Sequence, residues 1–472
     1  MNRILALLIL LIPAAYAAPL YEPKLTNDKK GVAHDFPMGV LSATGTLKDG
    51  DTDISIKHVG PEGAAIRAGL QPGDRIIKIG GEMPPPFSIK THTGIAGPQT
   101  FLANHLNKQG TAHPPTLRLE ILRGEQTKHI KITLPASAAF TNLDPKSDVK
   151  ARRFLQQTHQ HLSETQQENG RWRPGVGGDA DVYMSSFCAL HLLGAGKTEY
   201  LPAIKQAISF IREKSISSIN PKDPTVGPKS WQTSVNAILL AEYQLATGDR
   251  TYFEDLKRCC DLLTARVNDK GRMGHHWEVP YGGGGLVIIN GQAHIAWALA
   301  EKCGLPIDEL VWARSMDEMR KSIDPRTGAI GYSSKAPASP DIAARTGSMA
   351  IALSIADRES DLAKSLSNSL VKNHGRMRHA HAMSSIGLIY GFLAICNIDK
   401  KAYGRLLVEW MPYFELARSA AGPAVYFGGK RNIGGDQYLG LQPLSNAMVG
   451  LLLSGHEGRL FIQGNRKANW LQ

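Results

Sequence analysis

Cysteine is scarce in this chain of 472 residues: five are present, and the first lies at position 188. None has the C-x-x-C spacing of a metal or redox site, so we expect small buried side chains. Beyond the N-terminus no stretch reaches about 18 uninterrupted apolar residues, and we expect no transmembrane anchor in the mature chain. The G-x-S-x-G, H-E-x-x-H and local Cys/His signatures of familiar proteases are also missing.

The N-terminus has the three parts of a secretory signal peptide. Arg3 supplies positive charge, and the run from Ile4 to Leu11 is apolar but short. Ala15-Tyr16-Ala17 then offers a small-x-small cleavage site. These features predict a signal peptide over residues 1–17 and a secreted or periplasmic mature protein.

Positive charge exceeds negative charge across the whole chain. The formal net charge is +12, and Lys and Arg are scattered rather than gathered into one tract. A basic surface favours acidic partners such as anionic polysaccharides. No nucleic-acid-binding motif is present, so we expect no nucleic acid partner.

Residues 33–135 read as short alternating strands with turn residues between them. Within them the run from Val59 to Ile76 reads VGPEGAAIRAGLQPGDRI. It resembles the signature of bacterial, protease-associated PDZ domains, in which a helix of small residues precedes A-G-L-x-x-G-D-x-I. The physical pattern agrees, because Gly69 suits a left-handed helix end and Gly73-Asp74 suits a turn.

The resemblance implies a groove in which an extended peptide is added to a sheet edge. The carboxylate-binding loop would be Phe36-Pro37-Met38-Gly39-Val40, although Pro37 removes one amide donor. The segment after Val40 is expected to be the edge strand, and a helix over 101–109 the opposite wall. The predicted peptide-binding residues are Phe36, Met38, Gly39, Val40, Leu102 and Leu106. The alternative is a PDZ domain that serves only as an intramolecular brace.

After a polar linker over residues 136–147, amphipathic segments alternate with segments rich in Ala, Gly and Ser. Turn glycines recur about every 50 residues, at 170, 227, 271, 328, 375 and 428. Six helix pairs are therefore predicted over residues 148–472. The fold expected for the chain is a β-rich PDZ domain followed by an all-α (α/α)6 toroid, with an open solenoid as the alternative.

One turn, from Gln167 to Trp172, contains G-x-W and in this resembles the Q-x-x-x-G-x-W repeat of terpenoid cyclase and prenyltransferase toroids. Asp179-Ala180-Asp181 is similar to the D-x-D-D acid motif of class II cyclases, but Val182 replaces the Asp that donates the proton there. Over nearly its full mature length the chain resembles an uncharacterised bacterial secreted family that joins a PDZ domain to such a toroid. That resemblance implies the fold and no known activity.

In a closed ring the turns entering the inner helices share one rim, so polar residues in them are the candidate site. The catalytic candidates are Asp179, Asp181, His276, Tyr281 and Asp436. The candidates for cavity binding are Lys229, Trp231, His275, Trp277, Arg345, His379, His381 and Tyr438. We expect Asp179, His276, Trp277, Tyr281, His379 and Asp436 to converge at one mouth.

Structural roles compete with these assignments. Asp181 would cap an inner helix, and residues 282–285 would be a glycine-rich loop. His379 and His381 are two apart, which does not place them on one helix face, so no metal site is predicted. Paired carboxylates would support a glycoside hydrolase. A lyase would use His276 or Tyr281, with Lys229 and Arg345 neutralising a uronate, and the basic charge favours this version.

The leading hypothesis is an exported protein whose PDZ domain binds an extended peptide or C-terminus and whose toroid cavity binds a polymer such as a glycan. The alternative is a polysaccharide-degrading toroid enzyme, either hydrolase or lyase. A terpenoid-type cyclase is the third. The sequence indicates no cofactor, and it leaves open whether the toroid is catalytic.

Overall fold

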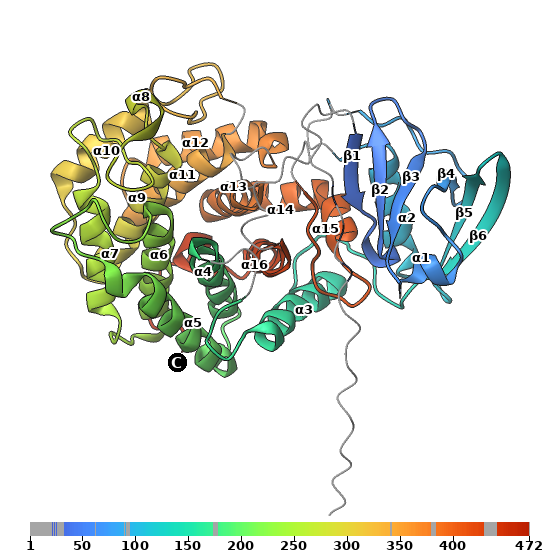
Figure 1. Ribbon diagram of the computed structural model, residues 1–472, viewed down its shortest axis with the longest axis horizontal. Coiled ribbons are helices and arrows are strands. Elements are labelled where there is room, and N and C mark those ends of the chain that lie inside the picture. The colour runs from blue at the N-terminus through green and yellow to red at the C-terminus, as the bar shows by residue number, and fades with distance from the viewer. Residues whose placement is uncertain are drawn as a thin grey trace, which may run out of the picture.

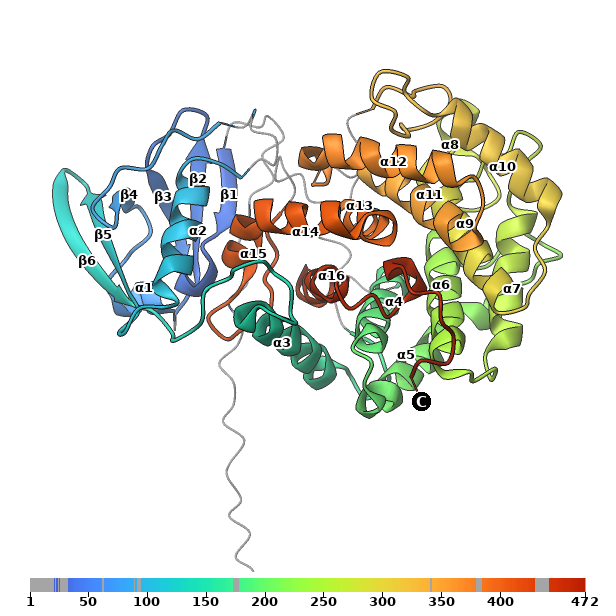
Figure 2. The ribbon, with the colours of Figure 1, turned by 180° about the vertical axis from the view of Figure 1, so that it is seen from behind.

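The computed structural model describes residues 21, 23, 25, 33–61, 63–88, 90, 95–172, 178–339, 342–378, 384–428 and 441–471. Of residues 281, 282 and 441 only the backbone is described. The predicted signal peptide lies outside these ranges. The chain forms a β-rich N-terminal part beside a larger ring of helices (Figures 1 and 2).

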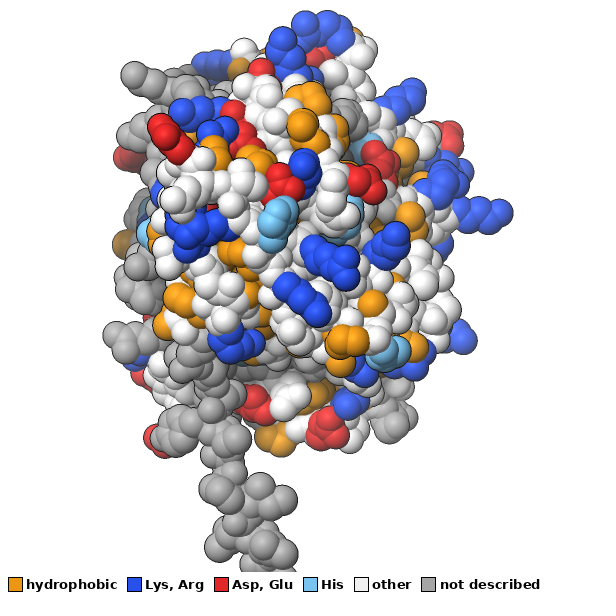
Figure 3. Space-filling view, turned by 90° about the vertical axis from the view of Figure 1, so that its right-hand side faces the viewer, with side chains coloured by type: hydrophobic (Ala, Val, Ile, Leu, Met, Phe, Trp, Pro, Cys, Tyr) orange, Lys and Arg blue, Asp and Glu red, His pale blue; other side chains and the backbone are white. Residues whose placement is uncertain are grey.

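The N-terminal part is one antiparallel sheet of six described strands in sequence order. These are β1 (Ala33–Pro37), β2 (Ala43–Lys48), β3 (Ile54–Val59), β4 (Arg75–Ile79), β5 (Thr116–Arg123) and β6 (Gln126–Thr133). The short helices η1 (Gly39–Leu41) and α1 (Ala64–Arg67) and the longer α2 (Pro98–Gln109) complete it. The surface on this side of the molecule carries scattered Lys and Arg side chains (Figure 3).

The PDZ-like motif has the local structure that its residues predict. Gly69 and Gly73 have φ of +82° and +92°, which side chains disfavour. Asp74 is buried and accepts hydrogen bonds from the backbone N–H of Gln71 at 2.8 Å and from Arg123 Nε at 2.7 Å. Burial raises the pKa of Asp74, but these bonds outweigh burial and lower that pKa below its ordinary value. The motif thus ties the turn before β4 to β5.

Twelve described helices make the ring. The inner helices are α4 (Asp179–Gly194), α6 (Ser230–Thr247), α9 (Val287–Lys302), α11 (Ala343–Ala356), α13 (Ser384–Ile398) and α16 (Leu441–Ser454). The outer helices are α3 (Val149–Thr165), α5 (Leu201–Lys214), α7 (Phe253–Ala265), α10 (Glu309–Lys321), α12 (Ser360–Lys372) and α14 (Lys400–Glu409). Each inner helix contacts the next, and α16 contacts α4 and α3. The ring is therefore closed, which confirms the (α/α)6 toroid and excludes the open solenoid.

Small residues let the inner helices approach closely. A Cβ on Gly347 of α11 would lie 2.3 Å from the carbonyl oxygen of Tyr390 in α13, and one on Gly291 would lie 2.0 Å from Ser348 Oγ. Real side-chain carbons do not reach such distances, so α11 and its neighbours can pack at this spacing only with glycine. This explains the Ala, Gly and Ser content of the inner helices.

Side chains fill the axis of the ring close to the helix starts. Gln292 Nε2 donates to the hydroxyls of Tyr183 at 2.9 Å and Tyr390 at 3.1 Å, and Phe187 packs against both tyrosine rings. All four side chains are buried and come from the first three turns of α4, α9 and α13. This layer of buried side chains therefore joins three inner helices across the ring.

The segment after α16 holds the ring together at the end opposite the starts of the inner helices. The amides of Phe461 and Ile462 donate to the Glu242 carboxylate of α6 at 3.0 and 2.8 Å. Further along, the amides of Asn469 and Leu471 donate to carbonyls at the end of α6. The last part of the chain thus links α16 to the second repeat, across the contact between the last and first repeats.

The two parts of the molecule are joined through α15 (Met411–Ala417), which contacts both α2 and η1. Lys150 of α3 forms a buried ion pair with Glu415 and donates to Asn107 Oδ1 of α2 at 3.1 Å. The Asp148 carboxylate, at the start of α3, accepts the amides of residues 141–143. The segment predicted as a linker is therefore tied to the helix that follows it.

We predict that Gly347→Ala lowers the free energy of unfolding by about 2 kcal/mol, because the added methyl group forces α11 and α13 apart. The control is Gly404→Ala in α14, where the new Cβ meets only His456, at 3.6 Å. That substitution should stabilise by up to about 1 kcal/mol, since alanine is the better helix former. Chemical denaturation of both variants tests this, and equal effects would contradict the packing described.

Glu242 gives the fold a pH dependence. Burial raises the pKa of this carboxyl from 4.5 to about 7, against the two amides that favour its ionised form. The folded state therefore holds the proton more tightly than the unfolded state does. The stabilisation that results is complete below pH 4.5 and is lost as the pH rises through about 7. We predict that unfolding between about pH 5 and 8 shows a loss of roughly 3 kcal/mol that Glu242→Gln abolishes. The exposed Glu213→Gln should leave it intact, and an unchanged profile in Glu242→Gln would refute the assignment.

Candidate functional site

The starts of the first three inner helices meet on one rim of the ring. Gln232 Nε2 of α6 donates to the backbone carbonyl of Asp179 at 3.1 Å, and the amide of Ser230 donates to the carbonyl of His275 at 2.7 Å. Successive turns into inner helices are thus hydrogen-bonded to one another, as a closed ring requires. Two hollows lie along this stretch of rim.

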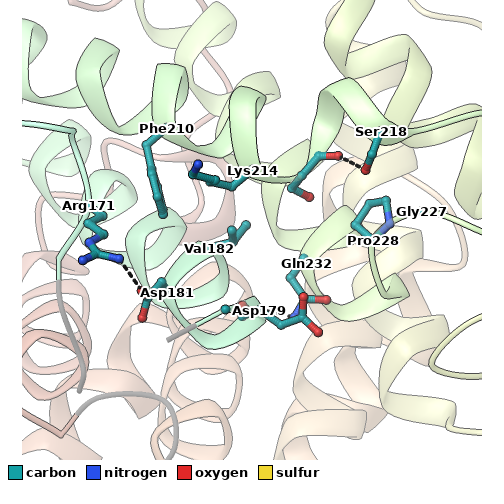
Figure 4. Close-up of a pocket in the computed structure, with 12 residues that line it drawn as sticks. Arg171, Asp179, Asp181, Val182, Phe210, Lys214, Ser218, Gly227, Pro228 and Gln232 are labelled. Carbon is teal, nitrogen blue, oxygen red and sulfur yellow. Dashed lines mark hydrogen bonds and ion pairs between the residues drawn. The ribbon is translucent and has the colours of Figure 1, made fainter. Parts of the chain in front are cut away.

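The first hollow has a volume of about 460 Å³ and lies between α4, α5 and the start of α6 (Figure 4). Asp181, which is buried, pairs with Arg171 at 3.2 Å. Asp179 is 52% exposed and pairs with Lys229 at 2.8 Å. The residues that line this first hollow are Arg171, Gly178, Asp179, Asp181, Val182, Phe210, Lys214, Ser215, Ser218, Gly227, Pro228 and Gln232. Both predicted carboxylates therefore face one hollow, and each has a cation beside it.

The second hollow, of about 490 Å³, is formed mainly by the segment after the third outer helix. Its lining residues are Thr225, His275, His276, Trp277, Glu278, Val279 and Pro280. Trp277 is 44% exposed, a high value for so large an apolar side chain. The ring nitrogen of Trp231 donates to His275 Nδ1 at 2.9 Å, which fixes one wall.

A residue that the sequence analysis did not single out holds the loop between the hollows. Arg266 is fully buried at the end of α7 and donates to the carbonyls of Pro224, Val226 and Pro228 at 3.0, 2.9 and 2.6 Å. Burial lowers its pKa to about 10, so it stays charged at neutral pH. Thr225 lines the second hollow and Gly227 and Pro228 line the first, so Arg266 positions the loop that separates them.

His276 lies in the electrostatic field of this cluster. Burial lowers its pKa, the charges of Arg266 and Lys229 lower it further, and Asp179 opposes them. The imidazole is therefore neutral at neutral pH, as a general base must be. Its Nδ1 is buried and has no hydrogen-bond partner within the part of the chain that the structure describes.

The structure brings together Asp179, Asp181, Lys229, Trp231, His275, His276 and Trp277. Arg345 is buried in α11 with its guanidinium 4.6 Å from the Tyr332 ring centre, and is not among the residues that line the hollows. The Tyr281 side chain, His379, His381, Asp436 and Tyr438 lie outside the described residues. Convergence across the whole mouth, and every catalytic role, stay predictions.

The competing structural role of Asp181 needs a correction. Helix α4 begins at Asp179 with Gly178 as its N-cap, so Asp181 lies in the first turn and does not cap the helix. Its carboxylate is near the positive end of the helix dipole, which favours its charge. Its partner there is Arg171, from the turn that carries the Q-x-x-x-G-x-W motif.

The predicted peptide groove of the PDZ-like domain is filled by the chain itself. Strand β2 pairs with β1 on one side and β3 on the other, so the expectation that the segment after Val40 forms a sheet edge is wrong. Strand β1 runs antiparallel to β2 and ends at the loop, in the position expected of a peptide. The residues predicted to bind a peptide, Phe36, Met38, Gly39, Val40, Leu102 and Leu106, are all buried.

The five cysteines are buried and unpaired, as expected of small core side chains. Among the described residues no group of three or more His, Cys, Asp or Glu side chains is arranged to hold a metal ion. A search of the same residues for a helix long and apolar enough to cross a membrane also finds none.

Fold and rim define a class of protein in which a PDZ domain precedes a closed (α/α)6 toroid with a polar rim. A PDZ family model matches residues 29–88. The model described as domain of unknown function DUF6288 matches residues 151–461, about two thirds of the chain. The chain belongs to the DUF6288 family.

Comparison with curated proteins gives no match. Among solved structures, the GH76A α-1,6-mannanase of Salegentibacter sp. HEL1_6 is 14% identical, with 66% of this chain and 98% of that chain covered and a TM-score of 0.47. A family 76 glycoside hydrolase from a bovine Bacteroides thetaiotaomicron strain is 12% identical, with coverages of 72% and 83% and a TM-score of 0.46. The type II terpene cyclase MstE from Scytonema is 13% identical, with coverages of 66% and 99% and a TM-score of 0.42.

We predict that Arg266→Met destabilises the protein by about 2–4 kcal/mol, because the buried carbonyl of Pro228 and the part-buried carbonyls of Pro224 and Val226 lose their donor. The loss should be local first, with faster amide hydrogen exchange in residues 224–232. Arg258→Met, on the exposed face of α7, is the control and should change neither quantity. Exchange rates that stay at the wild-type level in Arg266→Met would show that the loop is held by other contacts.

Proposed function

We propose that the rim formed by the first three repeats binds a polyhydroxylated polymer, a glycan, in an exported PDZ–toroid protein. The observation that carries this proposal is the pair of adjoining hollows, of about 460 and 490 Å³, on either side of the loop held by Arg266. Together they offer space for more than one sugar unit. Export rests on the signal-peptide pattern of residues 1–17.

The side chains in the two hollows suit sugar chemistry. An exposed indole such as Trp277 can cover the apolar face of a pyranose ring, while its surroundings stay polar. Carboxylates, the Gln232 amide and imidazoles can bond to hydroxyl groups. Because each carboxylate of the first hollow already pairs with a cation, the cluster is close to neutral overall. This balance supports an uncharged ligand over a strongly anionic one.

A second candidate function is cleavage of the bound glycan, supported by the neutral His276 in the field of Asp179. A neutral imidazole can remove a proton, and an exposed carboxylate can donate or accept one. A hydrolase would use a pair of acidic side chains. Asp179 and Asp181 are the two that the first hollow provides.

For the PDZ domain we propose the role of an intramolecular brace, with peptide binding as a secondary state. Strand β1 occupies the groove, and α15 packs on η1 so closely that a Cβ on Gly39 would lie 2.8 Å from the Glu415 carbonyl oxygen. A peptide could add to β2 only after β1 leaves. The buried Lys150–Glu415 pair stabilises the closed arrangement, since separating it would leave charges without partners.

We predict that Trp277→Ala weakens glycan binding by the full mature chain about tenfold, because a sugar face loses its aromatic cover. Binding is measured first on a glycan array and then by calorimetry with the best ligand. Leu310→Ala is the control, since Leu310 is 82% exposed on α10. The proposal fails if the array shows no binding or if Trp277→Ala binds as tightly as Leu310→Ala.

Catalysis is tested with the same ligand by mass spectrometry of the products. If the rim cleaves glycans, Asp179→Asn should reduce turnover by at least about 100-fold, the usual scale of a lost acid or base. The exposed Asp269→Asn should keep wild-type turnover. Products heavier by one water would indicate hydrolysis, and unsaturated products would indicate a lyase. Turnover that persists in Asp179→Asn would show that Asp179 has no catalytic role. If the wild type shows no turnover, the rim binds glycans without cleaving them.

A further inference from the structure

Gln232 is only 5% exposed, and its side chain has an unusual hydrogen-bonding state. It stands at the start of α6 and lines the first hollow, where it reaches toward Asp179 (Figure 4). Its Nε2 donates to the Asp179 carbonyl at 3.1 Å. Its Oε1 is buried, and no described residue donates a hydrogen bond to it.

The contact with Asp179 settles which way the amide faces. A backbone carbonyl only accepts hydrogen bonds, so the NH₂ end of Gln232 has to face it, and the oxygen has to be the free end. Reversing the amide would place two acceptors against each other. The wall of the hollow therefore holds a buried acceptor to which no described residue donates, and an acceptor in that state costs free energy until a donor reaches it.

Hydrogen-bond donors define the ligand that this position accepts. The cations nearest the hollow's carboxylates, Arg171 and Lys229, are already paired with Asp181 and Asp179. Gln232 adds another acceptor beside those carboxylates. Hydroxyl groups can donate to all of them. Lys214 also lines the hollow and pairs with Glu213 at 2.6 Å. The carboxylate of a uronic acid or a phosphate group, which only accept when ionised, would meet acceptors of the same kind at Asp179, Asp181 and Gln232.

We propose that Gln232 is a specificity-determining residue that selects neutral, hydroxyl-rich sugar units in the first hollow and rejects uronic acids. This proposal rests on the glycan-binding function proposed above and names its substrate class. It reverses the preference for uronates that the basic charge of the chain suggests. The Gln232 oxygen accepts one sugar hydroxyl while its amide keeps the contact that joins the first two repeats.

The test uses the full mature chain and two kinds of probe, neutral hexasaccharides (mannohexaose and cellohexaose) and hexagalacturonate. We expect the wild type to bind a neutral probe at least tenfold more tightly than the acidic one. Gln232→Met, which keeps the length and loses the acceptor, should weaken neutral binding about tenfold. Gln244→Met is the matched control: Gln244 lies on the same helix, is also buried and donates to a backbone carbonyl, that of Cys303, outside the hollow.

A second measurement does not depend on the variant's folding. In the wild type, the neutral probe should slow amide hydrogen exchange in residues 179–182 and 227–232. Equal neutral binding by Gln232→Met and Gln244→Met, or an absence of protection in these segments, would overturn the role of Gln232. Preferential binding of hexagalacturonate would overturn the specificity while leaving glycan binding in place. A wild type that binds neither probe would overturn both proposals.

Discussion

Closure of the ring between its last and first repeats is the constraint on which the rest of the structure depends. Helix α16 packs against α4, and the segment that follows it places two amides on the buried carboxylate of Glu242. Closure gives every inner helix an inner neighbour on each side. It also places the turns into the inner helices on a single rim, so residues far apart in sequence share one surface.

The proposed function rests on the two hollows along the rim of the ring. Near the rim, Gln292 and the two tyrosines it bonds join three inner helices across the ring. The first hollow carries two carboxylates, and the second combines polar side chains with the exposed Trp277, which is the combination on which the proposed glycan binding rests.

The fold could be predicted from the sequence because its signals are local and repeated. Gly69 and Gly73 mark the PDZ motif, and small residues mark each inner helix. The site could be predicted in part, because Asp179, Lys229 and His276 lie in equivalent turns. Arg266 and Gln232 were missed, since one lies in an outer helix and the other inside an inner helix, and only packing gives them their partners. The filled PDZ groove was missed because strand pairing between β1 and β2 is decided by tertiary contacts.

The central claim, that the rim of the first three repeats is the ligand site, is tested most directly by a crystal structure of the full mature chain with mannohexaose. The account predicts sugar density that starts within hydrogen-bond distance of Gln232 Oε1 and extends toward the ring of Trp277. Density confined to another face of the toroid, or to the PDZ domain, would contradict it.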